Sequence, residues 1–162
     1  MHRLPPALIN FLMHCQHFAA RFLRPMTLGV RAIVIDKESR ILLVRHSYIN
    51  GWHLPGGGVD AGEPLHEAMA REVLEETGAI LTAPAQFHGI FYNNRYSRSD
   101  HVAVYVVRDF HIASERKPDW EIRDVKFFDV RNLPEGTAGA TRARLAEVID
   151  GAPIQTMWQE AK

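Results

Sequence analysis

Hydrophobic and polar positions along the chain indicate a series of short strands interrupted by helices. Five segments are rich in β-branched and aliphatic residues and are bounded by polar turn clusters, a pattern typical of strands. They are residues 26–36, 41–46, 85–94, 100–110 and 121–130. The first two flank a turn cluster at residues 36–39, so we expect them to form a hairpin.

The patterns within two of these segments predict how they lie in a sheet. Residues 30–35 carry apolar side chains on both faces, which favours a strand in the sheet interior. Residues 100–110 alternate clearly. One side carries His101, Ala103, Tyr105 and Val107, and the other carries Val102, Val104 and Val106. We expect a mixed sheet with helices on both sides, which is an α/β sandwich.

Two helices are predicted between and after the strands. Residues 64–77 begin at Pro64, which suits the first helical position, and Gly78 follows as a stop. The apolar face of this helix consists of Leu65, Ala68, Met69 and Val73. A second helix is expected over residues 140–150, and residues 154–162 carry no predictive pattern.

Residues 1–25 are predicted to form an amphipathic helix, and residues 26–162 a single domain. The apolar stripe of this helix consists of Leu8, Phe11, Leu12, Cys15, Ala19 and Phe22. Polar residues interrupt any apolar run long enough to span a membrane, so we expect neither a transmembrane span nor a signal peptide. We expect the stripe to pack against its own domain, while a homodimer contact or a peripheral membrane contact stays open.

Composition and charge limit the classes of function. The chain has 162 residues, of which 46% are hydrophobic, and this is enough for one good core. A formal net charge of zero argues against binding to long nucleic acids but leaves nucleotides and short capped RNA ends open. Cys15 is the only cysteine, so we expect no intrachain disulfide, no cysteine-built zinc site, and a reducing, cytoplasmic setting.

Candidate chemistry is concentrated between residues 56 and 79. Glu72, Glu75 and Glu76 are spaced so that their carboxylates share one helix face. Such a face is usually only solvated, but the glycine run at residues 56–58 lets the backbone approach a ligand closely. The apolar opposite face can hold the carboxylates rigid. A rigid cluster of hard oxygen ligands suits Mg²⁺, which is commonly shared with substrate phosphates.

The same segment resembles the signature of the Nudix hydrolases. That signature is a glycine, five residues, a glutamate, seven residues, and then R-E-U-x-E-E-x-G-U, where U is a bulky aliphatic residue. The positions that match are Gly57, Glu63, Arg71, Glu72, Val73, Glu75, Glu76 and Gly78. Ala79 is a departure, because the family prefers a larger side chain there. Eight matching positions make this a specific signal, and the resemblance implies a Nudix-type α/β/α sandwich over roughly residues 26–151.

The resemblance also implies roles for individual residues. Glu75 and Glu76 would be the principal metal ligands, and Glu72 a further ligand or the group that takes the proton from water. The Gly56 carbonyl would be a backbone ligand, and Arg71 and Glu63 a structural pair. Mg²⁺ would be the metal, and Mn²⁺ may substitute for it. Glu121 matches a carboxylate position that joins the metal shell or accepts a proton in many relatives.

Several residues outside the signature are candidates for substrate contact. Arg31 and Arg45 lie within predicted strands, where a cation must find a carboxylate partner or a ligand phosphate, and both readings stay open. Arg95 and Tyr96 lie in a polar loop that could contact a nucleotide or form a solvated hairpin tip. Asp100 follows this loop and is, after Glu72 and Glu121, the third candidate for proton acceptor.

These observations predict a Mg²⁺-dependent pyrophosphohydrolase that uses metal-activated water to cleave a diphosphate linkage in a nucleoside diphosphate derivative. Nucleotide sugars, dinucleoside polyphosphates and nucleoside triphosphates are the expected small-molecule substrates. Three alternatives stay open. They are a 5′-end RNA pyrophosphohydrolase, a non-catalytic nucleotide-sensing module and a membrane-associated enzyme. An isoprenoid diphosphate isomerase is disfavoured, because that resemblance would bring a catalytic cysteine near the pocket, and Cys15 is poorly placed.

Overall fold

The elements expected from the sequence occur in the expected order, together with two short additional strands. The computed structural model describes residues 26–95, 97–114 and 116–159. The elements are β1 (Thr27–Val34), β2 (Arg40–His46), α2 (Leu65–Thr77), β3 (Ala79–Leu81), β4 (Gln86–Tyr92), β5 (Asp100–Val107), β6 (Phe110–Ile112), β7 (Ile122–Asp129) and α3 (Gly139–Ile149). The helix predicted over residues 1–25 lies outside the described residues. Across those described, no helix is both long and apolar enough to cross a bilayer.

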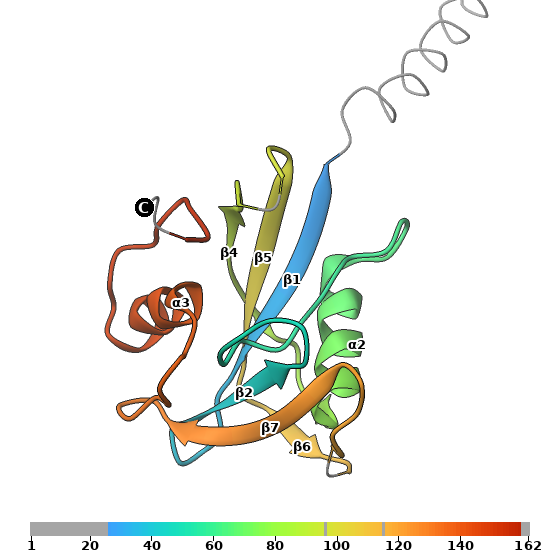
Figure 1. Ribbon diagram of the computed structural model, residues 1–162, viewed down its shortest axis with the longest axis vertical. Helices are drawn as coiled ribbons and strands as arrows, with labels where there is room; N and C mark the ends of the chain where they lie inside the picture. Colours follow the sequence, from blue (N-terminus) through green and yellow to red (C-terminus); the bar gives the residue numbers. More distant parts are fainter. Residues whose placement is uncertain (1–25, 96, 115, 160–162) are drawn as a thin grey trace, which may run out of the picture.

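A mixed sheet of β1, β5 and β4 forms the centre of the fold (Figure 1). β1 runs parallel to β5, and β4 runs antiparallel to β5. The other edge of β1 pairs with the glycine-rich loop, because the Val30 and Ala32 N–H groups donate to the Gly57 and Pro55 carbonyls, both at 2.9 Å. β1 therefore has partners on both sides, as its apolar faces predict. The same hydrogen bonds fix the glycine loop against the sheet.

The predicted hairpin between the first two strands is wrong beyond its turn. A tight turn does form, with the Asp36 N–H donating to the Arg40 carbonyl at 3.0 Å and a single bridge between Ile35 and Ile41. Beyond this bridge the strands separate, and β2 pairs antiparallel with β7. Turn residues act locally, whereas β1 and β2 bury their apolar faces against partners that are distant in the sequence.

Two hydrophobic clusters cover opposite faces of the central sheet. Alternate residues of β1 and β5 belong to different clusters, as the alternation in residues 100–110 predicts. One cluster contains Val30, Ala32, Val34, Ala103, Tyr105 and Val107 together with Ala68, Met69 and Val73 of α2. The other contains Ile33, Ile35, Val102, Val104 and Val106 together with Leu145 of α3. The two helices thus lie on opposite faces of a mixed sheet, and this arrangement is the predicted α/β sandwich.

The chain after α3 returns to the central sheet. Residues 151–159 run beside the end of β4, where the Tyr92 N–H donates to the Thr156 carbonyl and the Trp158 N–H donates to the Tyr92 carbonyl, both at 2.9 Å. This segment carries no predictive pattern in the sequence. Its position matters for the site described next.

Candidate active site

Helix α2 presents its carboxylates to the glycine loop because its apolar face is buried. Ala68, Met69 and Val73 are fully buried in the core on one side of the sheet. Pro64 precedes the helix as its N-cap, and Gly78 ends it with a φ of 72°. A side chain at Gly78 would meet the Ser114 carbonyl oxygen at 2.2 Å, so this position requires glycine on two grounds.

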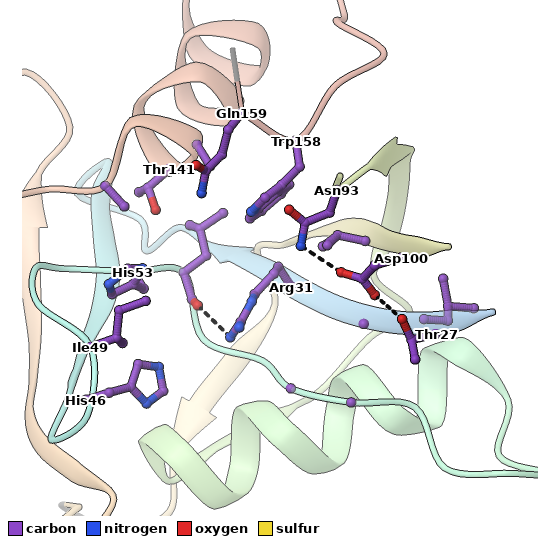
Figure 2. A pocket seen from close by; sticks show the side chains of 18 of the residues that line it. Thr27, Arg31, His46, Ile49, His53, Asn93, Asp100, Thr141, Trp158 and Gln159 are labelled. Atoms are coloured by element: carbon purple, nitrogen blue, oxygen red, sulfur yellow. Dashed lines mark hydrogen bonds between the residues drawn. The ribbon is translucent and has the colours of Figure 1, made fainter. Parts of the chain in front are cut away.

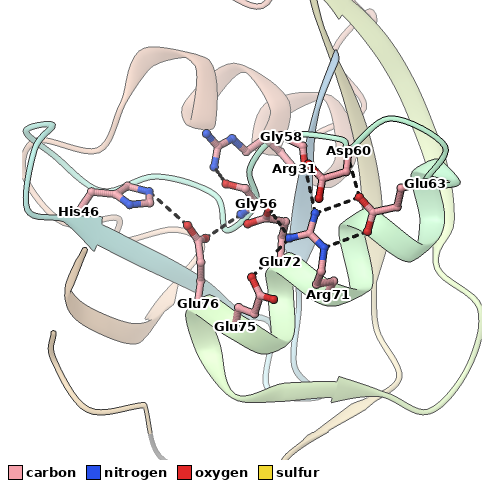
Figure 3. A network of polar contacts seen from close by, with 10 residues as sticks. All are labelled: Arg31, His46, Gly56, Gly58, Asp60, Glu63, Arg71, Glu72, Glu75 and Glu76. Carbon is pink, nitrogen blue, oxygen red and sulfur yellow. Dashed lines mark hydrogen bonds and ion pairs between the residues drawn. The ribbon is translucent and has the colours of Figure 1, made fainter. Parts of the chain in front are cut away.

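Glu76 is the carboxylate of α2 that the fold buries, with only 6% of its surface exposed. Its Oε2 accepts a hydrogen bond from the Gly56 N–H at 2.8 Å, and its Oε1 lies 3.8 Å from His46 Nε2. Figure 3 shows this carboxylate between His46 and the glycine loop. The helix and the loop are therefore joined directly at the candidate metal ligand.

Electrostatics around Glu76 favour a cation nearby. The pKa of Glu76 is raised to about 7, chiefly by burial and also by the charges of Glu72 and Glu121, while Arg31 and the Gly56 N–H act to lower it. Glu121 directly precedes β7 and is far from α2 in the sequence. Three carboxylates from two parts of the chain thus act on one another, and a bound cation would stabilise their ionised forms.

Arg71 holds the other carboxylates of the segment. Its guanidinium donates to both oxygens of Glu63, at 2.9 and 3.0 Å, and to Glu72 Oε1 at 2.8 Å. Glu75 Oε2 lies 3.4 Å from the same guanidinium, which also donates to the Gly58 carbonyl at 3.2 Å. The hydrogen bonds from Arg71 are the largest cause of the lowered pKa of Glu63. Arg71 and Glu63 thus connect the loop to the helix.

The donor set fits Mg²⁺ in its chemistry, although its side chains do not converge on one point. Within the described residues, no group of three or more histidine, cysteine, aspartate or glutamate side chains is arranged so that it could hold a metal ion. Glu72 and Glu75 turn towards Arg71, and the Gly56 carbonyl accepts a hydrogen bond from Arg31. All the same, the oxygens of these groups are the hard ligands that Mg²⁺ prefers, and Glu76 is a buried carboxylate near like charges.

A pocket of about 350 Å³ opens beside the glycine loop (Figure 2). Its walls come from β1, the end of β2, the glycine loop, the start of β5, the beginning of α3 and the C-terminal segment. Gly57 and Gly58 line it together with Arg31 and His46. Arg31 and His46 link the pocket to Glu76, because both act on that carboxylate.

The structure places only two of the predicted substrate-binding residues, among those it describes, in the pocket. Arg31 and Asp100 line the pocket. The Asp100 carboxylate accepts hydrogen bonds from Asn93 and Thr27, each at 2.6 Å. The other three residues lie elsewhere. Arg45 is 3.7 Å from Asp124 and stacks over Trp52, Arg95 donates to Gln159 at 2.7 Å, and Tyr96 is outside the described residues.

Some pocket residues are absent from the sequence prediction. His46 ends β2 and is 4% exposed, and burial, followed by the charge of Arg31, lowers its pKa to about 4. Its imidazole is therefore neutral near pH 7. Burial also lowers the pKa of His53, which lines the pocket as well. A histidine directly after an apolar strand is the one sequence signal that could have indicated His46. Trp158 and Gln159 had no such signal.

Comparison with known proteins finds relatives over most of the domain. A sequence model of the family described as NUDIX domain matches residues 25–149. The chain is 31% identical over 105 residues to an ADP-ribose pyrophosphatase of Methanocaldococcus jannaschii, covering 63% of this chain and 62% of that protein. It is 30% identical over 143 residues to the NAD-capped RNA hydrolase NudC of Vibrio cholerae, covering 83% of this chain and 51% of that protein.

A solved structure shows the same fold. The crystal structure of a MutT NUDIX hydrolase from Burkholderia pseudomallei superposes with a TM-score of 0.65 at 27% identity, covering 75% of this chain and 97% of the other. The matched region spans only between half and two thirds of the length of the two sequence relatives. The family match nevertheless includes the whole glycine loop, α2 and the central sheet. This chain belongs to the Nudix family.

Proposed function

We propose that this protein is a Mg²⁺-dependent pyrophosphohydrolase that cleaves a diphosphate linkage in a nucleotide derivative. The observation that supports this most is the buried Glu76 carboxylate, which bonds to the glycine loop beside a pocket. A buried carboxylate among like charges costs free energy unless a cation or proton compensates it. A metal-assisted hydrolase gives a reason for this arrangement.

In this proposal Glu72, Glu75 and Glu76 hold Mg²⁺. The bound metal would neutralise phosphate oxygens and lower the pKa of water, so that hydroxide is available near neutral pH. Arg31 adds positive charge inside the pocket and would bind the phosphate that faces β1. To do so it would exchange the hydrogen bond to the Gly56 carbonyl for one to the substrate. His46, neutral at this pH, would donate a hydrogen bond without repelling Arg31.

Two carboxylates are suited to accept the proton from the attacking water. Glu121 acts electrostatically on Glu76 and is partly exposed, so water can reach it. Glu72 shares one oxygen with Arg71 and keeps the other. Asp100 is less suited to this role, because both of its oxygens already accept hydrogen bonds. Separate pH–rate profiles for Glu72→Gln and Glu121→Gln would assign the role, because loss of the acceptor removes the acidic limb.

The proposed substrate is a nucleoside diphosphate linked to a further group. The two sequence relatives are named for ADP-ribose and for NAD-capped RNA, and each of these molecules contains a diphosphate bridge between two ribosyl groups. The pocket lies next to the glycine loop and has room for a nucleoside portion. A 5′-capped RNA end shares this chemistry at its terminus and is the second candidate.

A hydrolysis screen tests the proposal. Purified protein would be incubated with ADP-ribose, a dinucleoside polyphosphate, a nucleoside triphosphate, and NAD-capped or triphosphorylated RNA, each with Mg²⁺, with Mn²⁺ or with EDTA. We expect at least one diphosphate to be cleaved with metal and none with EDTA, and chromatography of the products identifies the phosphorus attacked. Binding of nucleotides without any metal-dependent cleavage would contradict the enzyme and favour a sensing module.

A further inference from the structure

The segment after α3 is held against the domain over residues 155–159. Its backbone joins β4 through the hydrogen bonds between Tyr92 and residues 156 and 158. Its side chains add the contact between Gln159 and Arg95 at 2.7 Å. The family match ends at residue 149, so this segment lies beyond the matched domain. It is a feature of this chain rather than of the family match.

A buried ion pair on α3 anchors the segment. Arg144 has no exposed surface and donates to Glu147 Oε1 at 2.6 Å. The same guanidinium donates to the Met157 carbonyl at 3.1 Å and to Gln155 Oε1 at 3.3 Å, and Glu147 Oε1 accepts the Gln155 N–H at 2.9 Å. A fully desolvated pair of this kind has a single favourable arrangement, so it fixes where the following residues lie.

This anchoring places Trp158 in the wall of the pocket. Its ring is half-buried, with the Phe91 ring centroid at 6.2 Å and the Arg144 guanidinium carbon at 5.8 Å from its centroid. Figure 2 shows Trp158 and Gln159 across the pocket from His46. His46 lies beside Glu76 and marks the charged end of the pocket. Trp158 lies at the opposite end (Figure 2).

We propose that Trp158 is a specificity-determining residue that stacks on the base of the nucleotide substrate, with the Gln159 amide beside it to bond the base edge. The inference rests on the proposed function, since it assigns one end of the same pocket. Apolar residues Val102 and Ala140 line the pocket and suit a flat base, whereas Arg31 suits a phosphate. Indole is an effective stacking surface for any base, and its removal weakens binding measurably.

Calorimetric titration with AMP and with ribose 5-phosphate, which lacks the base, tests this proposal. We expect the wild-type protein to prefer AMP, and Trp158→Ala to bind AMP about tenfold or more weakly. The affinity for ribose 5-phosphate should change less than about twofold. Trp158→Phe should keep most of the preference for AMP, because it retains a stacking ring. Ile154→Ala is the matched control, since Ile154 lies in the same segment and is 60% exposed.

Other results would overturn the proposal. It fails if Trp158→Ala binds AMP as the wild-type protein does, or if it loses affinity for both ligands equally. A wild-type protein without preference for AMP over ribose 5-phosphate also contradicts it. Thermal melting of each variant separates lost stacking from lost folding. Hydrolysis is not a readout here, so a protein that cleaves nothing would refute the proposed enzyme while the AMP comparison still decides the role of Trp158.

Discussion

The two walls of the pocket are built in different ways. One wall is the glycine loop, which α2 supports from outside the pocket; here the functional groups lie within a couple of dozen consecutive residues, and a hydrogen bond joins Glu76 of the helix to Gly56 of the loop. The other wall is the start of α3 with the C-terminal segment. Trp158 lies in this wall because Arg144 packs over Phe91 and donates hydrogen bonds to residues 155 and 157. Local spacing determines the first wall, and long-range packing determines the second.

This difference predicts which substitutions should affect catalysis and which should affect stability. Substitutions in the first wall should reduce catalysis and leave the fold intact, because Glu72 and Glu75 are not buried and a glutamine in place of the buried Glu76 can still accept the Gly56 N–H. Substitutions at the anchor of the second wall should reduce stability first, because Arg144 is fully buried. Measuring activity and stability for substitutions in each wall tests this separation of effects.

The largest effect is expected for Glu76→Gln. Glutamine keeps an oxygen that can accept the Gly56 N–H, so the fold should persist, but the neutral amide is a poor ligand for Mg²⁺. We expect kcat to fall about 1000-fold, measured under metal saturation against the best substrate of the screen. Glu67→Gln is the control, because Glu67 is an exposed glutamate in the first turn of the same helix. Near-normal turnover of Glu76→Gln would show that α2 takes no part in the chemistry.

The anchor of the second wall is tested by Glu147→Ala. This change leaves the Arg144 charge buried without its carboxylate partner and also removes the acceptor for the Gln155 N–H. We expect the free energy of unfolding to fall by about 3 kcal/mol in urea titrations. Glu135→Ala, at an exposed glutamate, should change it by less than about 0.5 kcal/mol. Equal stabilities for the two variants would show that the buried pair does not anchor this wall.

A pair of glycine substitutions tests the precision of the first wall. A Cβ at Gly57 would lie 2.5 to 2.6 Å from the Glu72 carboxylate, whereas a Cβ at Gly58 meets nothing within 4 Å. Gly57→Ala must therefore displace the flexible end of Glu72, and we expect kcat to fall about tenfold with little change in melting temperature. Gly58→Ala should retain nearly normal activity. Equal kcat values for both would mean that the position of Glu72 is not critical.

A smaller effect is expected from acid on the second wall. Burial raises the pKa of Glu147, but hydrogen bonds from Gln155, His88 and Arg144 outweigh it and hold the pKa below the ordinary value of 4.5. A carboxylate with a lowered folded-state pKa stabilises the protein above pH 4.5, and this contribution is lost as the pH falls through that lower value.

The measurement is the free energy of unfolding of wild-type protein and Glu147→Gln between pH 7 and pH 3. We expect the difference in free energy of unfolding between the two proteins to be constant above pH 4.5 and to become steadily smaller below pH 4.5. A difference that is independent of pH across this range would show that the ionised carboxylate is not what stabilises the anchor.

Much of the fold follows from patterns that are local in the sequence. The two-residue alternation in β5 predicted which side chains enter each core, and both helices lie within one residue or two of their predicted ends. The pairing of the strands was harder to predict from the sequence. The turn at residues 36–39 predicted a hairpin, yet β2 joins β7, because a strand's partner depends on burial of faces that meet only in the folded chain.

For the site, the spacing of residues in the sequence was enough to group the carboxylates of α2. Residues three and four apart on a helix face the same way whatever surrounds them, so Glu72, Glu75 and Glu76 could be grouped from spacing alone. It took the folded structure to show that Glu76 is the buried member, that Glu121 acts on it from the residue before β7, and that His46 and Trp158 line the pocket. These relations join distant segments through packing, and no local pattern encodes them.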